Sequence, residues 1–125
     1  FASLCHAIIT QELGRMKIEF EKKATVCKYA VPEGYPTKPV KNEKVEVPET
    51  EAKTYYASVD KKEDGLYMTG SRAIAFVGIG NNVEEAEKIA EEAVSNVKGK
   101  VFHRKDIGTK ELIQKRIEHI NKINN

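Results

Sequence analysis

The sequence predicts an α+β fold, in which a small, mainly antiparallel sheet has flanking helices. The expected elements follow one another as helix, strands, long loop, hairpin, strand, helix, strand and helix, and a hairpin pairs its strands antiparallel. Two segments toward the C-terminus repeat apolar residues with helical spacing, whereas the strand candidates are short. A length of 125 residues, with 40% hydrophobic and 32% charged side chains, suits one domain of ordinary size.

The N-terminal third is expected to contain one helix and two strands. Residues 2–13 carry apolar side chains near helical spacing, and Gly14 is a plausible C-terminal stop for this helix. Residues 16–20 alternate between apolar and polar side chains, which is typical of a short strand. Residues 24–31 are rich in β-branched and aromatic types, and Pro32 should end the strand that they form.

The middle of the chain contains all four prolines and a candidate hairpin. Residues 32–48 are expected to form a long ordered loop with one short extended piece, KVEV, at 44–47. Residues 54–59 and 65–70 flank the turn sequence DKKED and are expected to pair as a hairpin. Residues 72–80 are apolar enough to form a strand that is buried on both faces.

The next helix has the clearest signals in the sequence. Asn82 and Glu85 stand three residues apart, as in a capping box, and Gly99 should close the helix. Its glutamates are interpreted as a solvated surface. Its buried face is expected to consist of Val83, Ala86, Ala90, Ala93, Val94 and Val97.

A strand at 101–102 and a final helix are expected at the C-terminus. Thr109 can cap this helix, and three isoleucines recur along one side of it. They are expected to form its buried stripe: Ile113, Ile117 and Ile120.

The distribution of charge is compatible with binding to an acidic partner, but the sequence argues against binding to nucleic acid. The net charge is only +2, yet residues 98–125 hold eight Lys or Arg against three Asp or Glu. No aromatic residue interleaves with the basic ones, so we expect no nucleic-acid partner. An alternative function is a stand-alone binding domain whose basic C-terminal helix meets an acidic partner. That helix carries Lys110, Lys115, Arg116 and Lys122.

Several classes of site and location are not expected. No apolar run approaches the length of a transmembrane helix, and no signal-like start is visible, so we expect a cytoplasmic chain without a membrane partner. Cys5 and Cys27 form no CxxC pair and no histidine has zinc spacing, so no metal site is expected. We find no complete set of catalytic residues. The chain opens with Phe1 rather than Met, and we expect it to belong to a longer protein.

Two positively charged spots are the candidate binding residues. Arg72 follows a Gly-Ser turn and opens the apolar strand, where a guanidinium can grip a phosphate. The alternative is an ordinary arginine–carboxylate pair. Arg104 and Asp106 lie two apart and should share one strand face, whereas Lys105 should point the other way. Here the alternative is a charged edge that discourages strand pairing.

Three stretches of the sequence carry a family resemblance. They read ATVCKYAVPEGYP, TGSRAIAFVGIGNNVEEAEKIAEEAV and RKDIG, in this order. Together they resemble the C-terminal part of the glycinamide ribonucleotide synthetases, which are the phosphoribosylamine–glycine ligases of the ATP-grasp family. The resemblance covers essentially the whole chain. Its most specific elements are Gly34-Tyr35-Pro36, Arg72, and the run from Arg104 to Gly108.

The resemblance implies an enzyme of purine synthesis that joins glycine to 5-phosphoribosylamine with ATP, through a glycyl phosphate. Residues 1–21 would end the ATP-grasp core, and residues 22–125 would form a C-terminal domain with a rudimentary hybrid-type sheet beside the substrate cleft. The full enzyme would use ATP and Mg or Mn, held upstream of this chain. The chain alone would bind neither and would be inactive. Its partners would be the upstream core and the substrates phosphoribosylamine and glycine.

The resemblance also implies roles in the cleft for the charged run. Arg104 or Lys105 would face the ligand or the core, Asp106 would orient an arginine, and Gly108 would let the chain turn into Thr109. The alternative is that these residues hold the domain against the ATP-grasp core. One departure stands out. Where the family usually reads GTK, this chain reads Ser-Val-Asp at 58–60, so the basic residue is missing there.

Overall fold

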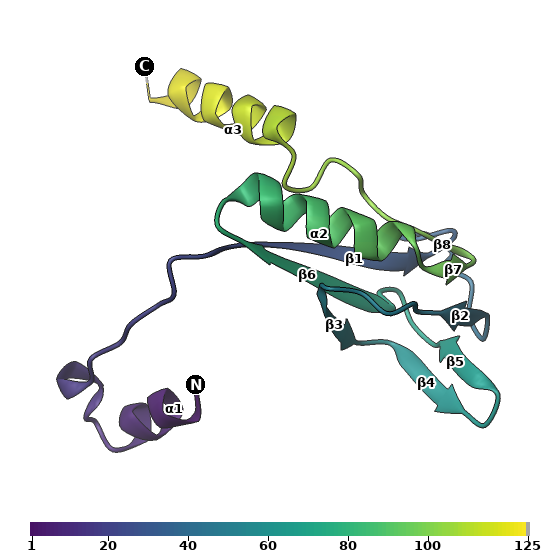
Figure 1. Cartoon of the computed structure of the whole chain (residues 1–125), viewed down its shortest axis with the longest axis horizontal. Coiled ribbons are helices and arrows are strands. Elements are labelled where there is room, and N and C mark those ends of the chain that lie inside the picture. Colours follow the sequence, from purple (N-terminus) through teal and green to yellow (C-terminus); the bar gives the residue numbers. More distant parts are fainter. Residues whose placement is uncertain (125) are drawn as a thin grey trace.

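The structure, a computed structural model, describes residues 1–124. These residues form two four-stranded sheets with only antiparallel pairing, together with three α-helices (Figure 1). The predicted α+β class is therefore confirmed, but the strands are divided between two sheets.

The first sheet carries the long strands. β1 and β6 pair from Ala24 opposite Gly80 to Ala30 opposite Ile74, and β3 extends the sheet beyond β6. β8 pairs with the other edge of β1 at only two residues, Val31 and Pro32. In spatial order, the strands are β3 (Lys53–Tyr56), β6 (Ile74–Gly80), β1 (Ala24–Pro32) and β8 (Val101–Phe102).

The second sheet is built from shorter strands, and it corrects the predicted hairpin. The run 54–59 does not form one strand, because the backbone N–H groups of Ala57 and Ser58 donate to the carbonyls of Ala73 and Arg72. The chain therefore passes there from β3 in the first sheet to a new strand that makes the hairpin. In spatial order, the strands are β4 (Val59–Lys62), β5 (Gly65–Met68), β2 (Lys44–Glu46) and β7 (Lys98–Gly99).

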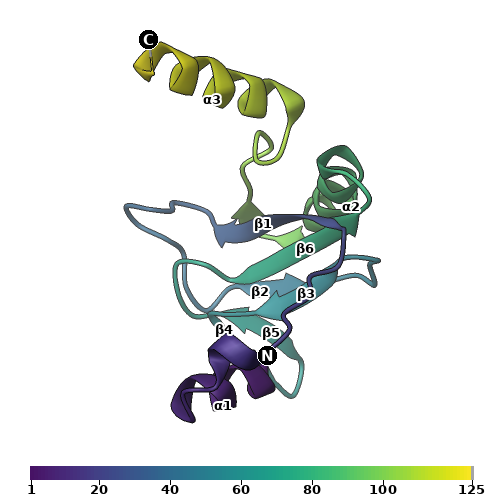
Figure 2. The same cartoon turned by 90° about the vertical axis from the view of Figure 1, so that its left-hand side faces the viewer.

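Helix α2 (Val83–Ser95) lies along one face of β1 and β6 (Figures 1 and 2). The predicted cap is confirmed, since Asn82 Oδ1 accepts a hydrogen bond from the Glu85 backbone N–H at 2.9 Å. A Cβ on Gly78 would lie 1.9 Å from the Ala86 carbonyl oxygen, so glycine allows the helix to approach this closely. The buried face of α2 consists of Ala86, Ala90, Ala93 and Val94.

The ends of α2 differ from the sequence prediction. The helix stops at Ser95, so Val97 lies outside it and Gly99 belongs to β7 instead of closing the helix. Val83 is 39% exposed and does not join the buried face. The core still joins α2 to both sheets, through fully buried Phe76 in one sheet and Met68 in the other.

The N-terminal segment lies apart from the sheets in Figure 1, although it overlaps the β4–β5 hairpin in the view of Figure 2. Helix α1 (Ala2–Ile9) is shorter than the predicted helix at 2–13, and a 3₁₀ turn, η1 (Leu13–Arg15), follows it. The predicted strand at 16–20 is wrong, because no neighbouring strand among residues 1–124 offers it hydrogen-bonding partners. Apolar side chains here meet solvent, with Phe20 87% exposed.

Helix α3 (Lys110–Ile123) also projects away from the body formed by the sheets and α2. Its cap is confirmed, because Thr109 Oγ1 accepts a hydrogen bond from the Leu112 backbone N–H. The prediction of a buried stripe is wrong. Ile113, Ile117 and Ile120 are exposed, since no element of the described chain packs extensively against this face. Within residues 1–124, no helix combines the length and apolar character needed to cross a membrane.

Candidate functional site

Two of the predicted residues line one pocket beside β1. Arg72, just before β6, and Arg104, just after β8, both face a cavity of about 450 Å³. We call it the arginine pocket. Its walls are otherwise largely apolar, and residues from β1, the loop after β1 and the segment after β8 form them: Tyr29, Val31, Tyr35, Pro36, Phe102 and Ile107.

Hydrogen bonds hold the backbone at Arg72, and this residue lines the arginine pocket. Its carbonyl accepts a hydrogen bond from the Ser58 N–H, and the N–H of Ala73 donates to Ala30 in β1. Among residues 1–124, no carboxylate forms an ion pair with Arg72, and Asp106 pairs with Arg104 instead. The structure therefore does not contain the arginine–carboxylate pair that was the alternative for this residue.

Arg104 and Asp106 form a two-pronged pair. Arg104 Nε donates to Asp106 Oδ1 at 3.0 Å, and Nη2 donates to Oδ2 at 2.5 Å. The hydrogen bond from Arg104 holds the pKa of Asp106 below its ordinary value, and Asp106 raises the pKa of Arg104 in turn. Asp106 thus lies where it can orient Arg104, and the role of this pair in a substrate cleft stays a prediction.

The predicted strand geometry of this segment is wrong, because β8 ends at Phe102 and residues 105–108 form a turn. Lys105 nevertheless lies away from the arginine pocket and beside a second cavity next to α2. Its backbone is the part that makes a contact, since the Lys105 carbonyl accepts a hydrogen bond from Lys28. The structure therefore brings together Arg72, Arg104 and Asp106, but not the side chain of Lys105.

A buried lysine behind the pocket was missed by the sequence analysis. Lys28 is 1% exposed, and its Nζ donates to Glu87 Oε1 and Glu91 Oε2, each at 2.6 Å, and to the Lys105 carbonyl at 3.0 Å. An ammonium group has three N–H donors, so every one has an acceptor. His103 Nε2 lies 2.9 Å from Glu91 Oε1 and extends the network.

Two of the α2 glutamates are therefore not the solvated surface that was predicted. Glu87 and Glu91 are four residues apart, so they lie on the same side of the helix, and both are only partly exposed. The sequence of β1 also contained a signal that Lys28 is buried. Lys28 alternates with Val26 and Ala30, both of which point inward, so the strand period places it on the buried face.

Gly108 holds the turn close to β1. Its φ of +80° lies in the left-handed region, and a Cβ there would come within 2.8 Å of Val26 Cγ1. Ile107 packs against Val26, and Thr109 Oγ1 donates to the Asp106 carbonyl at 2.9 Å. The implied turn at Gly108 is present, and it fixes the segment that carries Arg104.

Glu91 should make the free energy of unfolding depend on pH in the acidic range. Burial raises its pKa, but hydrogen bonds from Lys28 and His103 outweigh burial and lower the pKa to about 2 from an ordinary value of 4.5. Because the folded pKa is the lower one, Glu91 stabilises the fold fully above pH 4.5, and this contribution is lost as the pH falls toward 2. We expect about 2–3 kcal/mol from this carboxylate at neutral pH.

The test is urea unfolding at several pH values between 7 and 2.5. Glu91→Gln should be less stable than the parent at pH 7, and its stability should fall less steeply in acid. Glu92→Gln is the matched control, since Glu92 is exposed on the same helix. Parallel pH curves for Glu91→Gln and the parent protein would contradict the assignment.

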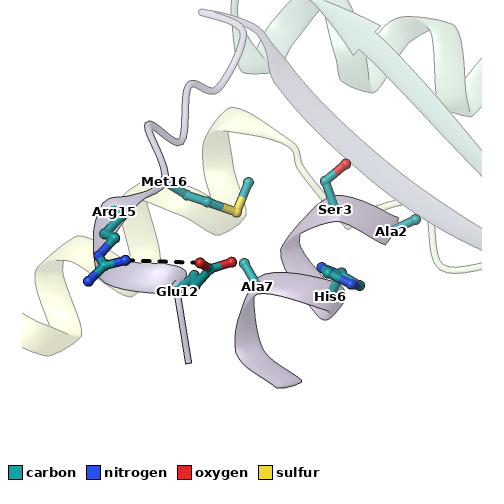
Figure 3. Close-up of a pocket in the computed structure, with 7 residues that line it drawn as sticks. All are labelled: Ala2, Ser3, His6, Ala7, Glu12, Arg15 and Met16. Atoms are coloured by element: carbon teal, nitrogen blue, oxygen red, sulfur yellow. Dashed lines mark ion pairs between the residues drawn. The ribbon is translucent and has the colours of Figure 1, made fainter. Parts of the chain in front are cut away.

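A larger cavity lies at the N-terminus, between α1 and η1 (Figure 3). Figure 3 shows Arg15 and Glu12 on one side of it and His6 on the other. Arg15 Nη1 and Glu12 Oε1 form an ion pair at 4.0 Å. The elements that enclose it pack mainly against each other, and Ile9 nearby is 80% exposed. These features suit a surface that another part of a protein covers better than they suit a ligand site.

Within residues 1–124, no three or more histidine, cysteine or acidic side chains gather as they would around an ion. Cys5 and Cys27 are unpaired and exposed.

Comparison with known proteins gives one consistent result. Residues 25–110, more than half of the chain, match the family described as phosphoribosylglycinamide synthetase, C domain. The chain is 53% identical to a phosphoribosylamine–glycine ligase of Methanocaldococcus jannaschii and 50% identical to one of Methanosarcina acetivorans. Each match covers 98% of this chain, but only 29% and 28% of the respective relative.

A solved structure agrees with these sequence matches. The crystal structure of a phosphoribosylamine–glycine ligase from Thermotoga maritima superposes with a TM-score of 0.58 and 30% identity. The superposition covers 62% of this chain and 20% of that protein. The family match, the sequence identities and the structural superposition agree. The chain therefore belongs to the phosphoribosylglycinamide synthetase C-domain family.

Proposed function

We propose that this chain serves as the C-terminal domain of a phosphoribosylamine–glycine ligase in purine synthesis. The longer enzyme joins glycine to 5-phosphoribosylamine while ATP is hydrolysed to ADP and phosphate. The observation that carries the proposal is the arginine pocket, which brings Arg72 and Arg104 together from segments 32 residues apart inside the family match. In this proposal, the pocket holds the phosphate of phosphoribosylamine.

The chemistry of the pocket supports a phosphate ligand. A guanidinium presents N–H groups in a planar fork that matches two oxygens of a phosphate. Asp106 occupies one side of Arg104 and fixes the direction of that fork. The apolar walls reduce the competition from water, which strengthens a contact between an arginine and an anion. Arg72, Arg104 and Asp106 are accordingly the proposed substrate-binding group, and Lys105 contributes through its backbone.

ATP and the metal ion are proposed to bind outside this chain. The described residues offer no cluster of oxygen or nitrogen ligands for Mg²⁺ or Mn²⁺, so they do not fit a metal site. The segment GIGNN, which ends β6 and leads into α2, also lacks a phosphate-cradling glycine pattern. The role proposed for this chain is to bind and orient one substrate, with the rest of the protein supplying the nucleotide chemistry.

The rest of the same protein is the proposed partner. The chain spans less than a third of its ligase relatives, and the family match begins at residue 25. We propose that residues 1–21 complete the ATP-grasp core and that residues 22–125 form the C-terminal domain. The exposed apolar side chains of α1 and of the segment around Phe20 support this division. A cytoplasmic location suits an enzyme that consumes ATP and phosphorylated sugars.

The alternative, a stand-alone domain that meets an acidic partner, rests on helix α3. This helix does project from the body with its basic side chains exposed. Ion pairing through such a surface would need no arginine pocket, and the family membership does not favour it.

The proposal is tested by assaying two purified proteins, the full-length gene product and residues 1–125 alone. We expect the full-length protein to hydrolyse ATP only when glycine and phosphoribosylamine are both present. Residues 1–125 should show no turnover, because nucleotide and metal ligands are proposed to lie elsewhere. Circular dichroism serves as the control that checks whether the short chain is folded. Turnover by residues 1–125, or a full-length protein that ignores phosphoribosylamine, would contradict the proposal.

A further inference from the structure

A buried ion cluster joins β1, α2 and the segment that carries Arg104. Lys28 comes from the strand, Glu87 and Glu91 come from the helix, and the Lys105 carbonyl comes from the segment after β8. Within residues 1–124, no buried side-chain nitrogen or oxygen lacks a hydrogen-bond partner. The cluster is therefore complete in itself and does not depend on a bound ligand.

The cluster fixes both neighbours of Arg104. The His103 ring lies 2.9 Å from Glu91 Oε1, and the Lys105 carbonyl accepts from Lys28 Nζ at 3.0 Å. Lys28 and Glu91 are hydrogen-bonded to each other at 2.6 Å. Arg104 thus stands between two residues that are tied to the same buried pair, so its backbone position depends on that pair.

Stability alone does not require an ion cluster at this position. Moving an ammonium and carboxylates out of water costs free energy, and replacing a whole buried cluster, lysine and carboxylates together, by apolar side chains of similar volume is often neutral or stabilising. What apolar side chains cannot supply is a directional bond to the Lys105 carbonyl. The cluster is therefore better explained by the geometry it imposes on the segment than by its contribution to folding.

We propose that Lys28 is a positioning residue for the arginine pocket, holding the segment after β8 so that Arg104 faces Arg72. This inference rests on the proposed function, since it assigns Lys28 to the binding of phosphoribosylamine through Arg104. Lys28 is among the residues that line the pocket, but its side chain is buried and its charged group is bound to α2 and to Lys105. It acts through Arg104 and makes no charge contact of its own with the substrate.

The test is a double-mutant cycle in the full-length protein. Arg104→Ala, Lys28→Met and the double variant are compared for the apparent KM of phosphoribosylamine, ATP and glycine. We expect Lys28→Met to raise the KM of phosphoribosylamine about tenfold and to leave the other two KM values within about twofold. In the Arg104→Ala background, Lys28→Met should add less than about twofold, because the residue through which it acts is gone.

Two further variants separate positioning from folding. Lys88→Met removes an exposed lysine from α2 and should leave all three KM values unchanged. All assays run well below the melting temperature of the weakest variant, so that loss of folded protein cannot imitate a change in KM. If Lys28→Met does not fold, Glu91→Gln replaces it, since Glu91 bonds both Lys28 and His103.

The outcomes distinguish the two proposals. If Arg104→Ala leaves the KM of phosphoribosylamine unchanged, the proposed function of the pocket is wrong, and this inference falls with it. If Arg104→Ala raises that KM but Lys28→Met, or Glu91→Gln in its place, does not, only the inference is overturned. Equal loss for all three substrates, or a full additive loss in the double variant, would also overturn it, because either result indicates a general structural role.

Discussion

Replacing Lys28 by methionine is expected to lower the free energy of unfolding by about 3–5 kcal/mol. The lysine is 1% exposed and neutralises two carboxylates from α2. Methionine has a similar length but no charge, so Glu87 and Glu91 would remain close together without a cation between them. A loss of this size is a large fraction of the stability of an ordinary domain. Urea unfolding of the parent and the variant at pH 7 measures it.

Two controls make this prediction specific to the ion cluster. Lys88→Met on the exposed side of α2 should change stability by less than about 0.5 kcal/mol. Lys28→Met combined with Glu87→Gln and Glu91→Gln should recover part of the loss, because the unpaired carboxylates are gone. A Lys28→Met loss below about 1 kcal/mol would show that the cluster is not the buried, charged network described here.

The elements that the sequence predicted well are those with local causes. Helix α2 carries its own cap at Asn82 and its own row of small buried residues, so neither depends on distant parts of the chain. β1 and β6 have compositions that suit buried strands and clear boundaries at Pro32 and Gly80. Such features follow from nearest neighbours and from periodicity, which a single sequence displays directly.

The wrong predictions share a different cause. They concern segments whose pairing or burial depends on another part of the protein. Residues 16–20 alternate like a strand, but alternation does not supply a neighbouring strand. The isoleucines of α3 repeat with helical spacing, but no described element covers them. The hairpin was misplaced because the backbone N–H groups of residues 57–58 donate hydrogen bonds to residues 72–73, just before β6. This pairing joins residues that are distant in the sequence, so the residues around 57–58 alone do not indicate it.

The candidate site shows the same division. Arg72 and Arg104 could be named from motifs, but their meeting in one pocket depends on the pairing of β6 and β8 with β1. Lys28 escaped notice because its partner Glu87 is 59 residues away, although strand alternation already placed the lysine inside. Lys105 was named for its charge, whereas the fold uses its carbonyl.

Arg72→Ala is expected to have the largest effect on substrate use. The guanidinium faces the arginine pocket and has no carboxylate partner among residues 1–124, so its charge is available to an anion. A charge-assisted contact to phosphate contributes about 1.5–3 kcal/mol, which corresponds to a ten- to hundredfold loss in the use of phosphoribosylamine. Arg72→Lys should recover part of this loss, because an ammonium cannot make the two-pronged contact.

The central claim, that this domain holds the phosphate of phosphoribosylamine through its arginine pocket, is tested most directly by steady-state kinetics of Arg72→Ala in the full-length protein. A melting curve on the same preparation shows whether the variant is folded. The account predicts that kcat/KM for phosphoribosylamine falls about ten- to hundredfold, while the apparent KM values for ATP and glycine stay within about twofold. An unchanged dependence on phosphoribosylamine, with or without a lower melting temperature, would contradict it.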